Sequence, residues 1–494
     1  MKCYILLVVF VSISATARGD YTAGVVEYAS LSEATPTATI EKNLEEYIHY
    51  IESARNNGVQ IIVFPEYGLT GIVTEPADYA IDVPNVKSGT TFTDYRLQKL
   101  SNAAREHSMY IVVNLLEKAS SENNDAIYYN TNIVFDRTGE IIAKYRKINL
   151  YTEPNLTAGN ETVTFTTDFG VTFGLLTSAD ILFYHPSKTI YSTGSITDIV
   201  FPTAMLSTIP FFHSLSLQSG YSQANRVNFL AASFNDPSHS LGGSGIYRHD
   251  GTIDTYYISG VTSSKLLVST LQPRGVPRNI DGGFTTFGFD ILNTSKSDTL
   301  SYHTPRDFRY DNYAIKQLEV TASGVEETLC QGAFCCSFAV TAVTTTVGEF
   351  YQLVVYNGPA MIGAVNRNIR LCTVVSCESQ DVSTCGSRNM SLITRFSKIG
   401  ITGNFESEPD HFYQPVTLTT LLLPVFNTSF SSETIDNTTS VTISSTRNIE
   451  NLIAFGILGR GHGGAPVFGS SVVFLVLMSV LRYMFYEVKN MTQF

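Results

Sequence analysis

The sequence predicts an α/β domain followed by a β-rich domain. Apolar runs of strand length alternate with segments of helical periodicity between residues 22 and 235, as expected for helices that cover a mixed sheet. Beyond about residue 310 the runs are rich in β-branched and aromatic residues and are separated by Gly and Pro, which is typical of strands and turns. A chain of 494 residues is also long enough for two domains.

The elements of the first domain follow from their periodicity. Apolar residues at helical spacing predict a helix over residues 40–56, and residues 92–107 and 211–224 are predicted as further helices. The run 59–64 is continuously apolar, as in a strand that is buried on both faces. Further strands are predicted at 21–28, 109–115, 127–136, 140–147, 171–176, 198–201 and 228–232, with a hairpin turn at 137–139.

The composition argues for a globular protein and against one that binds nucleic acid. Apolar residues make up 44% of the chain, which is typical of a protein with a substantial core. The formal net charge is −12, whereas binding to a phosphate backbone needs basic patches. We therefore expect no nucleic-acid partner.

Apolar segments lie near both ends of the chain. Residues 1–17 are predicted to be a signal peptide, because a positively charged start precedes an apolar stretch and an A-x-A pattern ends at Ala17. The segment 467–486 has three interpretations: a GPI-attachment signal, a membrane span or, least in keeping with its surroundings, a core helix. It follows a Ser/Thr-rich stretch, residues 434–447, which is predicted to be a stalk. We expect a secreted protein that this tail tethers to a membrane.

The cysteines and the glycosylation sequons agree with secretion. Six of the seven cysteines cluster in the second domain, and an even, clustered set in a secreted chain is typical of disulfides. Zinc is the alternative, but no histidine lies at ligand spacing nearby, so we expect no metal and no other cofactor. The expected disulfide cysteines are Cys330, Cys335, Cys336, Cys372, Cys377 and Cys385. The sequons are at Asn155, Asn160, Asn293, Asn389, Asn427 and Asn437.

Three predicted strands end in residues that can carry chemistry. Glu66 follows a buried strand, where a carboxylate is placed to act as a base, although a solvated loop acid is the simpler interpretation. Lys147 ends a second strand within a group of cations that alone indicates only a solvated face. Ser178 and Asp180 follow a third strand, where both could simply cap the next helix. The chain has no G-x-S-x-G, H-E-x-x-H or P-loop pattern.

Taken together and in this order, the three segments resemble the nitrilase superfamily and, within it, the vanin/biotinidase branch. The family glutamate base matches Glu66, its lysine matches Lys147, and its second acidic residue matches Glu153. The family nucleophile motif reads F-G-x-x-T-C-x-D-I-L-F, and residues 173–183 read FGLLTSADILF, which places Ser178 at the nucleophile. Further matching strings are Phe201-Pro202-Thr203-Ala204, Arg226-Val227-Asn228-Phe229-Leu230-Ala231, Gly243-Ser244-Gly245-Ile246-Tyr247 and the cysteine pattern from Leu329 to Gly386.

The resemblance implies both a fold and a reaction. The fold is a nitrilase-like α-β-β-α sandwich over residues 21–300, followed by a β-rich, disulfide-stapled vanin-type domain over residues 301–450. The reaction is hydrolysis of a small linear amide, such as a pantetheine or biotin amide, through an acyl-enzyme. Glu66 then moves protons, while Lys147 and the Ala179 N–H stabilise the oxyanion beside the accessory residues Glu153 and Asp180.

The chain departs from the family pattern at the nucleophile and close to it. Serine replaces cysteine at Ser178, an alanine follows it, and Met205 and Ser216 replace a tryptophan and an acidic residue of the family. Three hypotheses follow: a non-catalytic binding protein on an amidase scaffold, a serine amidase, or an allelic difference at position 178 in a normally active enzyme. The sequence favours the first, with weak or absent catalysis, and the retained Glu66 and Lys147 support the second.

Overall fold

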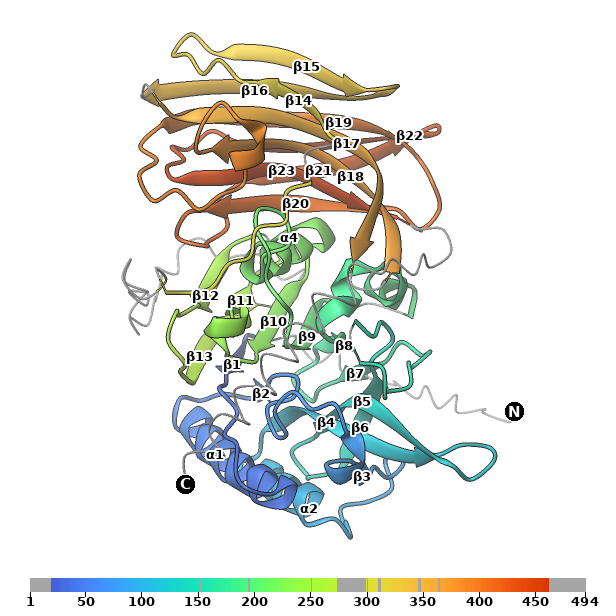
Figure 1. Ribbon diagram of the computed structural model, residues 1–494. Helices are drawn as coiled ribbons and strands as arrows, with labels where there is room; N and C mark the ends of the chain where they lie inside the picture. The colour runs from blue at the N-terminus through green and yellow to red at the C-terminus, as the bar shows by residue number, and fades with distance from the viewer. Residues whose placement is uncertain are drawn as a thin grey trace, which may run out of the picture.

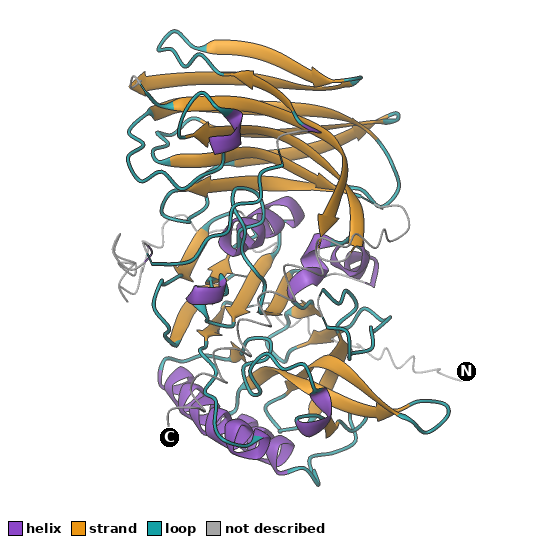
Figure 2. Ribbon diagram, in the orientation of Figure 1, coloured by secondary structure: helices purple, strands orange, loops and turns teal. Residues whose placement is uncertain are grey.

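The computed structural model describes residues 19–461, except 152, 194–195, 250, 273–298, 300, 310–311, 345–347 and 363–364. The predicted signal peptide, the tail 467–486 and Asn293 lie outside the described residues. In the part of the chain that is described, no helix is long and apolar enough to cross a membrane. Figure 1 shows two stacked domains, and Figure 2 shows that almost all the helix lies in the first of them.

The first domain contains two stacked sheets. The first sheet has the order β13-β1-β2-β4-β5-β6, with β3 paired to β4, and the second has the order β12-β11-β10-β9-β8-β7. Apolar side chains such as Val25, Val63 and Val112 of the first sheet meet Leu175 and Val200 of the second. The strands of the first sheet are β1 (Tyr21–Glu27), β2 (Ile61–Val63), β3 (Ile81–Asp82), β4 (Tyr110–Ser120), β5 (Ala126–Phe135), β6 (Ile141–Arg146) and β13 (Lys265–Leu271). Those of the second are β7 (Thr164–Thr166), β8 (Thr172–Leu175), β9 (Asp198–Thr203), β10 (Asn228–Ser233), β11 (Ser244–Tyr247) and β12 (Ile253–Tyr257).

Helices cover the outer faces of both sheets. Helices α1 (Pro36–Asn56) and α2 (Tyr95–His107) pack on the first sheet through leucines such as Leu44 and Leu97. Helix α4 (Ser214–Asn225) packs on the second sheet and lies between it and the second domain (Figure 1). Shorter helical segments are η1 (Pro76–Asp78), η2 (Ser178–Leu182), α3 (Tyr184–Ser187), η3 (Thr189–Thr193) and η4 (Pro237–His239). The α-β-β-α arrangement is therefore confirmed.

The second domain is a sandwich of two antiparallel sheets, which confirms the prediction of a β-rich fold. One sheet contains β14 (Ala314–Gln317), β17 (Phe350–Ile362), β18 (Val365–Cys377), β23 (Leu452–Arg460) and β20 (Phe412–Thr419) in that order. The other contains β15 (Val325–Gln331), β16 (Phe334–Thr344), β19 (Arg395–Glu406), β22 (Thr438–Ser445) and β21 (Ser429–Ile435). Phe338, Ile401 and Ile443 of the second meet Leu353 and Phe455 of the first in the core.

The prediction of a stalk at residues 434–447 is wrong. Most of this stretch forms β22, which pairs with β19 on one side and β21 on the other. Val441 and Ile443 point into the core and are fully buried, while the hydroxyl residues between them are more exposed. Alternation of Val and Ile with Thr and Ser is therefore typical of a half-buried strand, because β-branched residues fit a pleated surface well.

All six clustered cysteines form disulfides within the second domain, as predicted. The pairs are Cys330–Cys335, Cys336–Cys372 and Cys377–Cys385. Cys336 lies on β16 and Cys372 on β18, so this bond joins the two sheets of the sandwich. The Cys377–Cys385 bond closes a short loop after β18.

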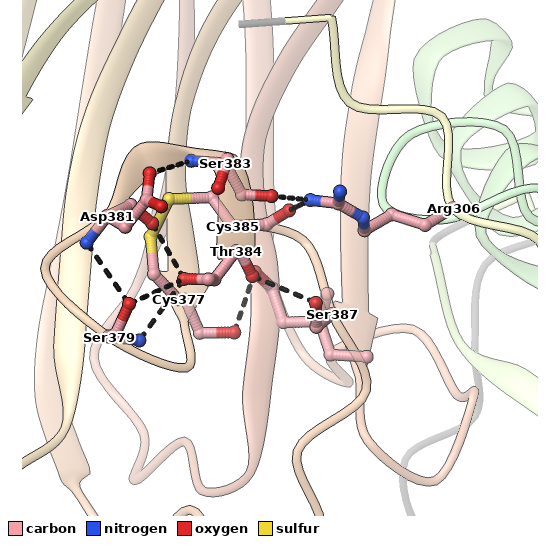
Figure 3. The surroundings of a disulfide bond; sticks show 10 residues. Arg306, Cys377, Ser379, Asp381, Ser383, Thr384, Cys385 and Ser387 are labelled. Atoms are coloured by element: carbon pink, nitrogen blue, oxygen red, sulfur yellow. Dashed lines mark hydrogen bonds between the residues drawn. A yellow bond between two sulfur atoms is a disulfide. The ribbon is translucent and has the colours of Figure 1, made fainter.

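The loop closed by Cys377–Cys385 binds a side chain from the segment that connects the domains. Figure 3 shows Arg306 reaching this loop, where Nη1 donates to the carbonyl oxygens of Ser383 and Cys385, the latter at 2.9 Å. Asp381 caps the turn by accepting from the Ser383 N–H at 2.9 Å. The arginine thus fastens the connecting segment to the second domain.

The same connecting segment is bonded to the first domain. The Ile209 N–H donates to the Pro305 carbonyl at 2.9 Å, and the Asp307 N–H donates to the Ile209 carbonyl at 2.8 Å. Pro210 packs against Gly386, the residue that follows the disulfide loop, where a Cβ added to the glycine would lie 2.9 Å from Pro210 Cδ. Residues around 209 are therefore held between the connecting segment and the disulfide loop.

Candidate active site

Three strand ends meet where the two sheets of the first domain adjoin. Glu66 follows β2 and Lys147 follows β6, both in the first sheet, whereas Ser178 follows β8 in the second sheet. Their side chains are 1%, 3% and 4% exposed, respectively. Residues distant in sequence are thus brought into one buried cluster, as the motif order predicts.

The Glu66 carboxylate is the centre of this cluster. Its Oε1 accepts from Lys147 Nζ at 2.8 Å and from Asn130 Nδ2 at 2.7 Å. Its Oε2 accepts from the Ser178 hydroxyl and from the Ala204 N–H, the latter at 2.8 Å. One oxygen is therefore committed to the lysine, and the other faces the predicted nucleophile.

Lys147 is shared by two acids. Its Nζ lies 2.8 Å from Glu66 Oε1 and 2.8 Å from Glu153 Oε2. Glu153 Oε1 accepts from Asn130 Nδ2 at 2.9 Å and from the Tyr67 hydroxyl. The accessory acid predicted at Glu153 is thus in direct contact with the lysine, and the two carboxylates flank a single cation.

Ser178 occupies a strained position at the start of η2. Its φ is +40°, in the left-handed region that a residue with a Cβ rarely adopts. Its hydroxyl donates to Glu66, lies 3.1 Å from Thr203 Oγ1 and accepts from the Ala204 N–H at 2.8 Å. Strain of this kind gathers at functional sites, where it fixes a side chain in a direction that an ordinary helix start would not give.

Burial and the shared cation set the charges of the cluster. Burial raises the pKa of Glu66 above its ordinary value, against the opposing effect of Lys147 and with the help of Glu153. Burial alone would lower the pKa of Lys147, but the two carboxylates raise it well above its ordinary value. Burial opposes ionisation of Glu153 as well, yet Lys147 lowers its pKa. Lys147 and Glu153 are therefore charged at neutral pH, and Glu66 is the group that can take up a proton.

Asp180 orients the loop that carries Ser178. Its Oδ2 accepts from the Tyr145 hydroxyl at 2.6 Å and from the Thr177 N–H at 3.0 Å. Its Oδ1 accepts from the Asn149 N–H at 2.9 Å and the Asn149 amide at 3.0 Å. Asp180 thereby ties the turn that carries Ser178 to the chain just beyond Lys147.

The other departures from the family pattern do not all lie at the site. Ala179 and Met205 are buried in the apolar cluster beside the second sheet. Ser216, on α4, accepts from the Thr417 N–H of β20 at 3.2 Å. The Ser216 hydroxyl therefore serves the contact between the domains.

Several residues in the cluster have no role that the sequence motifs indicate. Asn130 touches both carboxylates, Tyr67 touches Glu153, and Thr203 and Ala204 contact the Ser178 hydroxyl. A signal for Asn130 is present in the sequence, because asparagine is depleted in strands and yet lies inside one here. No local pattern indicates the Ala204 N–H, since a backbone donor carries no residue preference.

Two sequence matches define the class of this protein. Residues 22–252 match the carbon–nitrogen hydrolase family, and residues 302–463 match the vanin C-terminal domain. The structure is similar to Nit3 of Saccharomyces cerevisiae, with 22% identity and a TM-score of 0.42; the match covers 51% of this chain and 90% of the Nit3 chain. The family match over residues 22–252 places the first domain in the carbon–nitrogen hydrolase class.

Full-length relatives define the family within that class. The chain is 31% identical to Vanin-like protein 1 of Drosophila melanogaster, over 92% of this chain and 88% of the relative. It is 28% identical to human Pantetheinase, over 83% of this chain and 84% of the relative. The chain belongs to the vanin family.

Proposed function

We propose that this protein binds a small linear amide and hydrolyses it slowly, with Ser178 as nucleophile. The observation that carries the proposal is the hydrogen bond from the Ser178 hydroxyl to Glu66, a carboxylate whose pKa is raised by burial. A buried carboxylate with a raised pKa is a stronger base than one in water, so it can take a proton that an ordinary glutamate would not hold.

The reaction balances with the residues in this cluster. Ser178 Oγ attacks the amide carbonyl carbon while Glu66 takes the hydroxyl proton, and the carbonyl oxygen becomes negative. The C–N bond then breaks, the proton on Glu66 passes to the leaving amine, and an ester to Ser178 remains. Water attacks this ester, Glu66 takes the water proton and returns it to Ser178 Oγ, and the acid leaves.

Lys147 is placed to stabilise the negative oxygen. An ammonium group has three N–H donors, and Glu66 and Glu153 accept two of them at 2.8 Å each. Among the described residues no acceptor is recorded for the third, which is then available to the substrate oxygen. The Ala179 N–H is the second donor that the family resemblance assigns to this oxygen.

The serine makes this chemistry slow. A cysteine thiol ionises near neutral pH, whereas a serine hydroxyl is far less acidic and must lose its proton during attack. Serine hydrolases commonly use a histidine or a lysine as base, but Lys147 is held in its charged form by two carboxylates. Glu66 alone remains, and we expect turnover orders of magnitude below that of a cysteine nucleophile.

The names of the relatives suggest a class of substrate. Human Pantetheinase aligns with 83% of this chain, which makes a pantetheine-like amide the first compound to test. Biotin amides are the second, because the sequence also resembles biotinidase. Neither needs a metal or a cofactor in the reaction described above.

The proposal is tested with purified full-length protein and a panel of pantothenyl and biotinyl amides. We expect weak release of amine, its loss in Ser178→Ala, and at least ~10-fold faster release in Ser178→Cys, because a thiolate is the better nucleophile. Ser101→Ala is the matched control, since Ser101 is also buried but its hydroxyl donates to the Gly139 carbonyl and not to a residue of the cluster. Equal turnover in the natural protein and in Ser178→Ala would contradict the proposal.

A binding protein without turnover is the second candidate. It is favoured by Lys147, whose fixed positive charge can hold a ligand carbonyl even when no attack follows. Calorimetric binding of a pantothenyl amide, with no amine released by the natural protein or by Ser178→Cys, would select this function over the first.

We also infer an extracellular location, either secreted or tethered by the tail at 467–486. Three disulfides support it, because such bonds persist in oxidising compartments. The described sequons are accessible: Asn155, Asn160, Asn427 and Asn437 are exposed and Asn389 is half-buried. Release of the protein from cells by a phosphatidylinositol-specific phospholipase tests a GPI anchor against a membrane span.

A further inference from the structure

Three asparagine side chains lie in the interior between Glu66 and Ser178. Asn114 is on β4, directly opposite Asn132 on β5, and Asn130 is two residues before Asn132 and so on the same face. None is more than 1% exposed. Buried amides inside strands cost stability unless they are hydrogen-bonded, and asparagine is a poor strand former. Three of them at one place need an explanation beyond the fold.

A single backbone N–H fixes the direction of every hydrogen bond in this group. The Tyr67 N–H donates to Asn114 Oδ1 at 2.9 Å, so the other end of the Asn114 amide must be the donor. Asn114 Nδ2 then donates to Asn130 Oδ1 at 2.6 Å and to Asn132 Oδ1 at 2.9 Å. Asn130 and Asn132 are thereby forced to present their own N–H groups outward. We call Asn114, Asn130 and Asn132 the amide relay.

The two branches of the amide relay end at different parts of the site. Asn132 Nδ2 donates to Thr177 Oγ1 at 2.8 Å, next to the nucleophile position. Asn130 Nδ2 donates to Glu66 Oε1 at 2.7 Å and to Glu153 Oε1 at 2.9 Å. The N–H of Tyr67, the residue directly after Glu66, is thus linked to both acids and to the nucleophile loop.

The Asn130 branch stabilises two buried carboxylates that share one cation. Two buried carboxylates share one lysine. A second cation would compensate the remaining negative charge and lower the pKa of Glu66, which would make Glu66 a weaker base. An amide supplies one N–H to each carboxylate without adding charge. It therefore holds the acids on either side of Lys147 and leaves Glu66 with an affinity for a proton.

We propose that Asn130 is a positioning residue that holds Glu66 and Glu153 in place as a base and its partner, with its direction set by Asn114 and the Tyr67 N–H. The inference rests on the proposed function, because only in that reaction must Glu66 act as a base. It assigns a task to residues that the catalytic steps do not use directly.

The test follows the titration of Glu66 itself, which does not depend on turnover. Full-length protein with ¹³C-labelled glutamate carboxyls is titrated by NMR, and the Glu66 signal is identified by its absence in Glu66→Gln. Asn130→Ala removes a donor that favours the ionised form, so the midpoint of Glu66 should rise by about one pH unit, a tenfold change in its ionisation constant. The low-pH limb of the rate profile in Ser178→Cys should move by the same amount.

Asn132→Ala is the matched control. It removes an equally buried amide on the same face but leaves the hydrogen bonds from Asn130 to both carboxylates in place. We expect it to leave the Glu66 midpoint within about a quarter of a pH unit, well below the shift in Asn130→Ala. Asn130→Ser retains one donor and should give a smaller rise, which keeps the test open if Asn130→Ala does not fold. An unchanged midpoint in Asn130→Ala, or equal shifts in Asn130→Ala and Asn132→Ala, would overturn the proposal. A shifted midpoint without turnover in any variant would support the positioning role and reject the amidase function.

Discussion

Removing the positive charge from the cluster should destabilise the fold in a way that depends strongly on pH. Lys147 is 3% exposed, and its Nζ lies 2.8 Å from one oxygen of Glu66 and 2.8 Å from one oxygen of Glu153. Lys147→Met keeps most of the side-chain volume but leaves two buried carboxylates without a cation. Breaking a buried ion pair costs about 3–5 kcal/mol, and because two acids lose their partner here we expect about 5 kcal/mol at pH 7.

The loss of unfolding free energy in Lys147→Met should become smaller as the pH falls. In Lys147→Met both acids are buried without an opposite charge, so their folded pKa values lie above the unfolded ones. Such groups contribute stability below the unfolded pKa, and that stability is lost as the pH rises through the folded pKa. In the natural protein Glu153 behaves in the opposite way, since its folded pKa is lowered and its contribution disappears as the pH falls. Both effects narrow the difference between the two proteins between pH 7 and pH 4.

Urea unfolding followed by circular dichroism at several pH values measures this difference. Lys144→Met is the matched control, because Lys144 pairs with Glu117 at 3.1 Å and Glu117 keeps its bonds to Arg146. We expect it to lose at most about 1 kcal/mol at any pH. A loss in Lys147→Met that is under about 1 kcal/mol at pH 7, or one that grows toward pH 4, would refute the reasoning.

Two further predictions concern stability outside the site. Burial raises the pKa of Glu27 to about 7. The stability that Glu27 contributes is therefore fully present when the pH is below the ordinary pKa of a glutamate, and it is lost as the pH rises through 7. The natural protein should therefore lose up to about 3 kcal/mol of unfolding free energy through Glu27 between pH 5 and pH 8, and Glu27→Gln should not show this loss. The same dependence of unfolding free energy on pH in both proteins would contradict this. Replacing both cysteines of the Cys336–Cys372 pair by Ala should cost about 2 kcal/mol more than the same change in the Cys330–Cys335 pair, because it opens a longer loop. Urea unfolding of the two double variants checks this, and an equal loss would show that loop length does not decide it.

Much of the fold could be predicted from periodicity, but the ends of the helices could not. Helix α1 begins at Pro36, before the predicted residue 40, because Thr35 accepts from the Ala38 N–H and proline fits the first turn. Helix α2 begins at Tyr95, after the predicted residue 92, because Asp94 accepts from the Arg96 N–H. Apolar spacing reports which face of a helix is buried, whereas its start is decided by capping side chains outside the periodic segment.

The residues of the candidate site could also be predicted only in part. Glu66, Lys147 and Ser178 could be found because each follows a strand within a long recognisable string, and the structure brings all three together. The Ala204 N–H and the amide relay could not, because their positions depend on which strands become neighbours in the two sheets. A sequence motif names the candidate reactive groups, whereas the residues that hydrogen-bond to them follow from the three-dimensional arrangement.

The bonds between Arg306 and the disulfide loop connect an early part of the chain to a part that is synthesised much later. Synthesis proceeds from the N-terminus, so the segment from Ala204 to Pro210 is made long before Cys385. Yet Ile209 is bonded to the connecting segment, Arg306 binds the Cys385 carbonyl, and Pro210 packs against Gly386. These contacts of residues 209 and 210 can therefore form only after the second domain has been made, and a chain cut before Arg306 would lack them.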